Sequence, residues 1–354
     1  MSIKNQANFW LKNVCDFDVA EHNFADETIE GFNAFSTLMR NIYEDDHSFE
    51  ISTKGDTITK IGIAENDLEN YHNLTETVDC LYKMSAVGEL DVCGEEVCLK
   101  IDKTLFKTKF KKSVAFVFSM LEKHGFYFLF YKNGNEVKEY KQCNTFCLYY
   151  ENSDKLIPSM KLLADTLAKQ TVKTDLSNGL AFFMADYEAI FTGAKATPKK
   201  QNIINLLGDL TPLWLSFANN ADKFGLDYDL TINPYVFPNW TVKILSGKKT
   251  VCTFNINSGS LLIRLPLSFE MAKDLISVRK TLPNSINNCI SRWNCVNCGK
   301  CENQSNIEIV EGVPLCTLKY SNFCTEDSRI LSFYMTTQSE LKTVNDLIAT
   351  AVSL

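Results

Sequence analysis

The stretch WTVKILSGKKTVCTFNINSGSLLIRLPL, residues 240–267, shows most clearly how this chain folds. Two runs of strand-forming residues flank a turn at residues 246–249, which predicts a β-hairpin. The run GSLLIRLPL, residues 259–267, predicts a third strand. Ser268 then offers an N-cap for a helix over FEMAKDLISVRKTL, residues 269–282. Hairpin, strand and helix in this order indicate an α+β domain.

The first half of the chain repeats this order of elements. A helix that ends at Gly125 is followed by the hairpin pattern FYFLFYKNGNEVKEY, residues 126–140, the strand TFCLYY, residues 145–150, and a helix over 153–170. In both halves the helix before the strands ends in Lys-aromatic-Gly, here at residues 123–125 and in the second half at residues 223–225. We therefore expect two related helix–antiparallel-hairpin–strand–helix units in tandem. Chance recurrence of a common order is the alternative.

The length and composition of the chain predict its division into domains. Its 354 residues favour two domains over one. We expect an N-terminal α+β domain with a helical lead-in over 1–170, a polar linker over 171–200, and a C-terminal α+β domain over 201–354. A Cys-rich insertion is expected at about 289–325. Near the end of the chain, Thr337 and Glu340 form a capping-box pattern at the start of a helix.

The insertion begins with CISRWNCVNCGKC, residues 289–301. Cys295 and Cys298 have the spacing of a zinc knuckle, and Cys301 follows closely. The segment IEIVEGVPLC, residues 307–316, predicts a hairpin that turns at residues 311–312 and returns Cys316 to the same point. Four thiolates around one ion form a closed tetrahedral set, which is typical of structural zinc. The predicted metal ligands are therefore Cys295, Cys298, Cys301 and Cys316.

Several alternatives to this ligand set remain. Cys324 competes with Cys301 for the fourth position. Cys289 is interpreted as a core thiol, because it shares helical spacing with Ile286, Ile290 and Trp293. An iron–sulfur cluster is less favoured than zinc, since the closing x₃-Cys-Pro of the ferredoxin run is missing. The segment could also bind no metal.

The pattern CVNCGKC…IEIVEGVPLC resembles a Cys-rich insertion of small uncharacterised bacterial α+β proteins with YjbR/YdhG-like cores. The resemblance covers only the second half of the chain. It implies a Trp-bearing hairpin, a third strand and a helix between Trp240 and Leu282. It also implies a bound metal, and it carries no established activity.

The remaining cysteines are expected in the core. Cys93, Cys98, Cys143 and Cys147 could form a second quartet, but their spacings are not those of a knuckle. Cys98 and Cys147 fall within apolar strand runs, and Cys252 shares a strand face with Phe254, which favours packing roles for these thiols.

Charge and composition restrict the function. The net charge is −7, which disfavours a broad nucleic-acid surface, and no apolar run is long enough to cross a membrane. The N-terminal segment lacks a secretory pattern, and the thirteen cysteines are an odd number, so we expect a cytoplasmic protein with reduced thiols. The chain has no H-E-x-x-H motif, no G-x-S-x-G motif, no P-loop and no G-x-G-x-x-G motif, so we assign no catalytic or cofactor-binding residue.

We therefore expect a binding or regulatory protein with structural zinc and no assignable reaction. Its partner is unknown, and a protein and a small molecule are both candidates. One alternative is an enzyme whose site assembles only in the folded chain. The other is a nucleic-acid-associated regulator that uses the six lysines of KIDKTLFKTKFKK, residues 100–112, although a solvated lysine face is the simpler interpretation.

Overall fold

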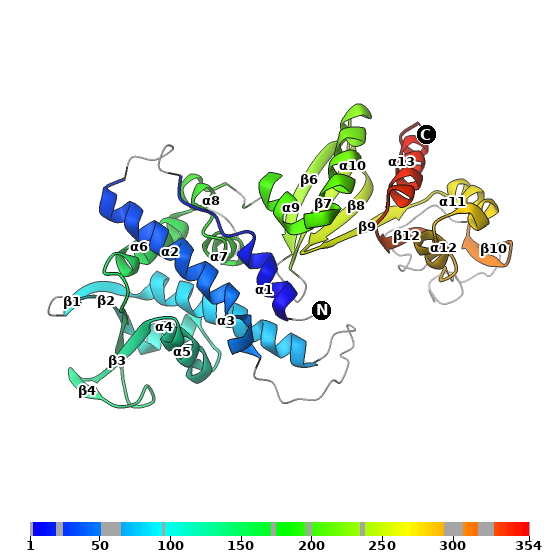
Figure 1. The fold of residues 1–354 in the computed structure, drawn as a ribbon. Coiled ribbons are helices and arrows are strands. Elements are labelled where there is room, and N and C mark those ends of the chain that lie inside the picture. The colour runs from blue at the N-terminus through cyan, green and yellow to red at the C-terminus, as the bar shows by residue number, and fades with distance from the viewer. Residues whose placement is uncertain are drawn as a thin grey trace. The chain divides into compact units, whose positions relative to one another are not determined.

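The computed structural model describes residues 3–18, 24–50, 65–93, 96–170, 175–194, 196, 200–233, 238–293, 307–317 and 329–353. Within it the chain forms two compact units. The first contains Met1–Ala196, and the second contains Thr197–Asn233 and Asn239–Leu354. Each unit combines helices with an antiparallel sheet, as expected for an α+β protein (Figure 1).

The described helices of the first unit are α1 (Ile3–Leu11), α2 (Asp26–Glu44), α3 (Glu65–Val87), α4 (Lys103–Lys109), α5 (Val114–Lys123), α6 (Leu156–Lys169), α7 (Asp175–Phe183) and α8 (Tyr187–Thr192). Its strands are β1 (Glu89–Cys93), β2 (Glu96–Asp102), β3 (Phe126–Lys132), β4 (Asn135–Val137) and β5 (Thr145–Tyr150). They form one antiparallel sheet in the order β1-β2-β5-β3-β4. The expected strands at 126–150 are therefore present, and β1 and β2 form a further hairpin.

Alternating residues of this sheet face a helical core. Phe128 and Phe146 are buried on the inner face, where Phe118 of α5 stacks on Phe128 with ring centroids 4.0 Å apart. Leu99 and Leu148, which are paired across β2 and β5, are fully buried on the same face. Since strand side chains alternate between faces, the intervening residues of β2, β3 and β5 point away from this core.

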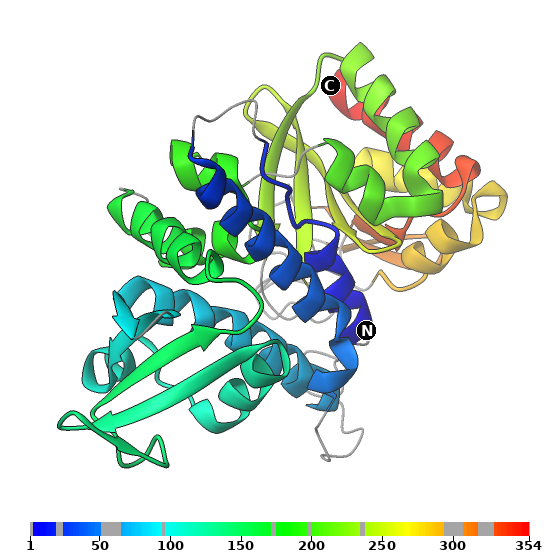
Figure 2. The ribbon, with the colours of Figure 1, turned by 60° about the vertical axis from the view of Figure 1, so that its left-hand side comes forward.

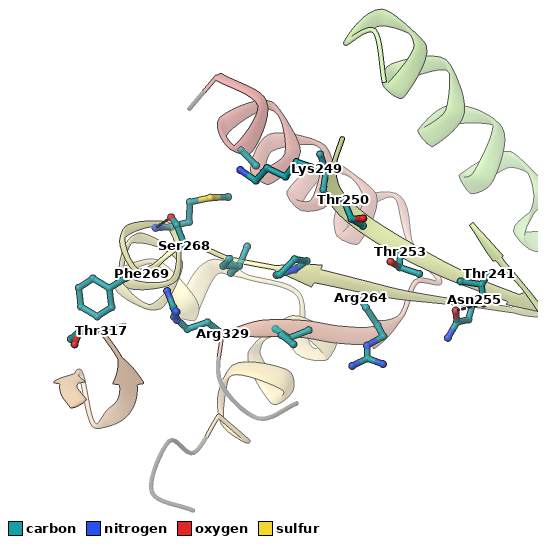
Figure 3. Close-up of a pocket in the computed structure, with 16 residues that line it drawn as sticks. Thr241, Lys249, Thr250, Thr253, Asn255, Arg264, Ser268, Phe269, Thr317 and Arg329 are labelled. Atoms are coloured by element: carbon teal, nitrogen blue, oxygen red, sulfur yellow. Dashed lines mark hydrogen bonds between the residues drawn. The ribbon is translucent and has the colours of Figure 1, made fainter. Parts of the chain in front are cut away.

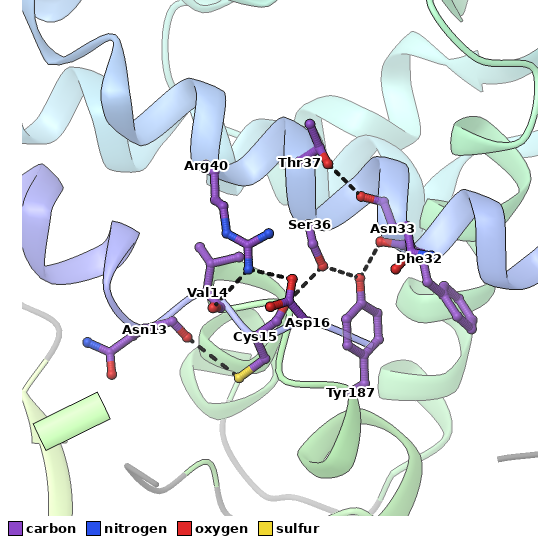
Figure 4. Close-up of polar contacts among 10 residues, drawn as sticks. All are labelled: Asn13, Val14, Cys15, Asp16, Phe32, Asn33, Ser36, Thr37, Arg40 and Tyr187. Atoms are coloured by element: carbon purple, nitrogen blue, oxygen red, sulfur yellow. Dashed lines mark hydrogen bonds and ion pairs between the residues drawn. The ribbon is translucent and has the colours of Figure 1, made fainter. Parts of the chain in front are cut away.

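Helices α7 and α8 lie within the expected linker, 171–200. Tyr187 of α8 forms hydrogen bonds within the first unit (Figure 4). The Tyr187 hydroxyl donates to the Phe32 carbonyl oxygen at 2.6 Å and lies 2.8 Å from Ser36 Oγ. Ser36 Oγ in turn donates to the carbonyl oxygen of Cys15 at 2.8 Å. Burial raises the pKa of Tyr187 well above its ordinary value, so the hydroxyl keeps its proton. The segment 187–192 is therefore part of the first unit's packing.

The described helices of the second unit are α9 (Lys200–Leu207), α10 (Thr211–Lys223), α11 (Phe269–Ser277), α12 (Asn284–Ile290) and α13 (Gln338–Ser353). Its main strands are β6 (Asp227–Asn233), β7 (Asn239–Ser246), β8 (Lys249–Asn257), β9 (Ser260–Pro266) and β12 (Ile330–Tyr334), and they form an antiparallel sheet in the order β12-β9-β8-β7-β6. The hairpin, third strand and helix expected over 240–282 are confirmed as β7, β8, β9 and α11. Short 3-10 turns occupy Asp46–Phe49, Gly208–Leu210 and Arg279–Thr281.

Local signals at the helix ends and at the turns are also confirmed. Ser268 Oγ accepts from the backbone N–H of Met271 at 3.2 Å, as expected of an N-cap. Thr337 and Glu340 form the predicted capping box: the N–H of Thr337 donates to Glu340 at 2.8 Å, and the N–H of Glu340 donates to Thr337 Oγ1 at 3.3 Å. Gly247, with φ +59°, lies in the two-residue loop between β7 and β8. Helix α11 ends at Ser277, before the expected Leu282.

The expected tandem duplication is not confirmed, because the two sheets differ in strand order. In the first unit the strand that follows the β3–β4 hairpin, β5, pairs with the first strand of that hairpin, β3. In the second unit the strand that follows the β7–β8 hairpin, β9, pairs with the second strand of that hairpin, β8. Two copies of one unit would share a strand order. The shared helix ends and glycine turns reflect local helix and turn chemistry, which does not fix how distant strands pair.

Candidate functional site

The sheet of the second unit has a core face and a polar face. Helices α10 and α13 cover the core face, where Phe217 of α10 packs on Phe254 with ring centroids 4.5 Å apart (Figures 1 and 2). Side chains that alternate with the core residues form the polar face. Across it, Thr253 is paired with Arg264 on one side and with Lys243 on the other. This row of the polar face therefore carries cationic and hydroxyl groups, and it ends at Asp229 of β6, which is paired with Lys243.

A cavity of about 940 Å³ extends along this polar face to the start of α11 (Figure 3). Three cationic side chains line it: Lys249, Arg264 and Arg329. Uncharged hydrogen-bonding groups also line it: Thr241, Thr250, Thr253, Asn255, Ser268 and Thr317. The apolar part of the lining comprises Val251, Pro266, Leu267, Phe269, Met271, Ile330 and Ala351. None of the lining residues that the structure describes is acidic.

The two arginines enter the cavity from different elements. Arg264 projects from the middle of β9, whereas Arg329 precedes β12 and lies near Ser268 and Phe269 (Figure 3). Arg329 is only 2% exposed, and its backbone has a left-handed φ of +58°. Its carbonyl oxygen accepts from the N–H of Leu267 at 2.8 Å, which ties this turn to the end of β9. Because arginine stays protonated, both side chains bring permanent positive charge to the cavity wall.

The first turn of α11 adds to this positive potential. The N-terminal end of a helix carries partial positive charge on backbone N–H groups that have no partner within the helix. Ser268 satisfies one of these groups, that of Met271, and both residues line the cavity. Glu270 also lies in the first turn, but it is exposed to solvent and does not line the cavity. The α11 end therefore supports the charge that the cationic side chains establish.

The predicted metal ligands are only partly described. The hairpin expected at 307–316 is confirmed as β10 (Ile307–Val310) and β11 (Val313–Cys316), joined by a turn in which Glu311 and Gly312 have positive φ. Cys316 ends β11 and is 1% exposed. The other three, Cys295, Cys298 and Cys301, lie outside the described residues, as does the competitor Cys324. Among described residues, no three His, Cys, Asp or Glu side chains are grouped in a way that could hold a metal.

The thiols interpreted as core residues are buried where the structure describes them. Cys98, Cys147 and Cys252 are at most 3% exposed, and burial raises the pKa of Cys252 strongly. Cys289 is 5% exposed on the expected helix face, α12; it accepts from the N–H of Ser332 at 3.2 Å. Burial also raises the pKa of Cys289. These contacts support the packing interpretation of Cys289.

The lysine-rich stretch 100–112 makes several contacts within the first unit. Lys103 Nζ donates to the carbonyl oxygens of Tyr140, Lys141 and Cys143 at 2.6–2.9 Å. Lys100 pairs with Asp91 at 3.1 Å, and Lys112 pairs with Glu76 at 2.8 Å. Half of the six lysines thus have partners inside the protein, so the stretch offers less charge to a nucleic acid than its composition suggests.

The cationic cavity was not predicted from the sequence. Arg264 carried a detectable signal, since it is the charged residue in the otherwise apolar run SLLIRLP. Arg329 carried none, because the next strand, β12, was not predicted, and its pairing with β9 joins residues more than sixty positions apart. A cavity formed by such long-range pairing has no local motif.

Comparisons with protein-family models, with curated proteins and with solved structures found no match for this chain. Among the described helices, none combines the length and the apolar character needed to cross a lipid bilayer. The function is therefore argued from the geometry of the site itself.

Proposed function

We propose that the second unit binds a small organic anion in the cavity on the polar face of its sheet. The observation that carries this proposal is the lining: Lys249, Arg264 and Arg329 contribute positive charge, and no described lining residue is acidic. A cavity surrounded by charge of one sign concentrates ligands of the opposite sign. This holds even though the whole chain is acidic, with a net charge of −7.

The chemistry of the lining indicates which anions fit. Arginine binds carboxylates and phosphates through two parallel hydrogen bonds, and the threonine hydroxyls can donate to further oxygens. Phe269, Met271 and Ile330 supply apolar surface beside Arg329. The volume is within the usual range for small-molecule sites. We therefore infer a ligand with an anionic group and an apolar body.

Isothermal titration calorimetry with phenyl phosphate, benzoate and inorganic phosphate tests this proposal. We expect phenyl phosphate to bind more tightly than inorganic phosphate, because its ring can be buried against the apolar lining. Benzoate distinguishes a carboxylate site from a phosphate site. Arg264→Met should weaken binding by about tenfold or more, since a charge-assisted hydrogen bond contributes about 1.5–3 kcal/mol.

The matched control is Lys243→Met. Lys243 lies on the same sheet face, paired with Asp229 at 3.7 Å, but it does not line the cavity. Its substitution should leave binding nearly unchanged. Binding that is unaffected by Arg264→Met, or no binding of any of the three anions, would reject the proposal. Release of phenol from phenyl phosphate by the wild type, lost in Arg264→Met, would favour the enzyme alternative at the same site.

We also propose that Cys295, Cys298, Cys301 and Cys316 hold one structural zinc ion in the insertion. The support is the knuckle spacing in the sequence together with the β10–β11 hairpin, which ends at buried Cys316. Closed thiolate sets of this kind stabilise segments that have little apolar core of their own. The proposal requires reduced thiols, which the cytoplasm would supply.

Elemental analysis of protein purified without added metal tests the zinc proposal. We expect one zinc per chain in the wild type and in the control Cys252→Ala, which removes a core thiol of the same unit. Cys298→Ser should lose the metal. If Cys301→Ser retains zinc and Cys324→Ser loses it, Cys324 replaces Cys301 in the ligand set. Iron with sulfide would identify a cluster, and a wild type without metal would overturn the proposal.

A further inference from the structure

The sheet of the first unit has an outer face that carries a tyrosine cluster of its own. Cys98, Cys147 and Tyr149 are buried there, and Tyr127, Leu129 and Tyr131 pack against them. All six residues come from strands β2, β3 and β5, and none of the helices that the structure describes contributes a residue to the cluster. Helix α5 packs on the opposite, inner face through Phe118. The cluster is therefore an apolar patch outside the helical core, and we call it the tyrosine face.

The rings of the tyrosine face are ordered by contacts within the sheet. Tyr127 and Tyr149 stack with centroids 4.7 Å apart and planes inclined by 6°. The Tyr127 hydroxyl donates to Glu96 at 2.5 Å. Burial and this hydrogen bond raise the pKa of Tyr127 to about 12, so the ring stays neutral. Tyr127 and Tyr131 remain partly exposed, so part of their ring surface can be reached from solvent.

Acidic side chains surround the tyrosine face. Residues paired across antiparallel strands share a face, so Asp91, paired with Cys98, and Glu136, paired with Tyr131, belong to it. Glu96 belongs to it through its hydrogen bond to Tyr127. Glu89 also belongs to it, because it is paired with Lys100, which lies two residues after Cys98 and therefore on the same side of β2. Lys100 is the one cation of these paired positions, and it is bound to Asp91 at 3.1 Å. Carboxylates thus dominate the rim.

We propose that the tyrosine face binds an extended, basic segment of a partner protein. Arginine and lysine side chains are attracted to the faces of tyrosine rings, and the carboxylate rim complements their charge. Leucine-sized residues of the same segment would cover the apolar surface around Leu129. An aromatic sheet face can also stack the bases of single-stranded RNA, but the carboxylates would repel its phosphates. Charge complementarity therefore favours a basic peptide.

Fluorescence anisotropy with a labelled eight-residue peptide that alternates arginine and leucine tests the proposal on the full chain. We expect saturable binding that weakens as salt is added, because the rim attraction is screened. A peptide with glutamate in place of arginine should not bind. Tyr131→Ala and Glu136→Gln should each weaken binding by about two- to fivefold, the effect of one exposed cation–π or ionic contact.

The control variant is Glu122→Gln, which removes an exposed carboxylate from α5, on the other side of the sheet. It should leave peptide affinity unchanged, and this separates the tyrosine face from general attraction to an acidic protein. Equal weakening by Glu122→Gln and Glu136→Gln would overturn the proposal. So would tighter binding of an eight-nucleotide oligouridylate than of the basic peptide, or an affinity that Tyr131→Ala does not change.

Discussion

In the part of the chain that the structure describes, the two sheets differ most on the faces that point away from their helical cores. Both sheets are five-stranded and antiparallel, and both bury a face rich in aromatic and aliphatic residues. The outer face of the first carries tyrosines with a carboxylate rim, whereas that of the second carries arginines and hydroxyl groups around a cavity. The core residues thus define the fold class, and we propose that the residues between them determine the charge of the ligand that each unit binds.

Substitutions on the two faces of the first sheet should lower the free energy of unfolding by unequal amounts. Phe128→Ala removes an inner-face ring that stacks on Phe118, and we expect it to destabilise the protein by about 3–5 kcal/mol. Tyr131→Ala removes a partly exposed outer-face ring and should cost about 1 kcal/mol or less. Urea unfolding of both variants measures the difference. Equal costs would mean that the tyrosine face is part of the core and not a surface for a partner.

Lys103 of the first unit should serve stability, whereas we propose that the cations lining the cavity of the second unit serve binding. Lys103 Nζ donates to three carbonyl oxygens and lies 4.7 Å from the centre of the Tyr140 ring. Lys103→Met should therefore destabilise the protein by about 2–3 kcal/mol, since it leaves these acceptors without their charged donor. The control Lys107→Met, on the exposed side of the same helix, should change stability by less than about 0.5 kcal/mol. Thermal unfolding that shows the same loss for both would contradict the distinction.

A carboxylate of the second unit is held inside the protein, in contrast to those on the rim of the first. Burial alone would raise the pKa of Glu340, but hydrogen bonds from Ser285, Thr336 and Thr337 outweigh it and lower this pKa. Its stabilising effect is thus fully present above the unfolded value of about 4.3 and is lost as the pH falls through the lower folded value. We expect the wild type to lose more stability between pH 6 and pH 3 than Glu340→Gln does. An identical pH dependence in both would show that Glu340 gains nothing from ionisation.

The parts of this fold that could be predicted are those coded by neighbouring residues. The hairpins, the Ser268 cap, the Thr337–Glu340 capping box and the turn at Glu311–Gly312 all depend on local turn and cap chemistry. Strand order was not predictable, because β12 pairs with β9 across a long separation in the chain. The same separation hid the cavity, whose two arginines come together only when this pair forms. Strand β6 was also missed, although it pairs with β7 through a short connection.

Taken together, the two proposals mean that two outer faces of one protein select ligands of opposite charge. The most direct test is to titrate wild type, Arg264→Met and Glu136→Gln with both phenyl phosphate and the arginine–leucine peptide. We expect a crossed result: Arg264→Met loses about tenfold or more in affinity for phenyl phosphate and keeps its affinity for the peptide. Glu136→Gln weakens peptide binding by about two- to fivefold and leaves phenyl phosphate binding intact. If both variants weaken the affinity for both ligands equally, or change neither affinity, the two faces are not separate binding surfaces and the proposals fail.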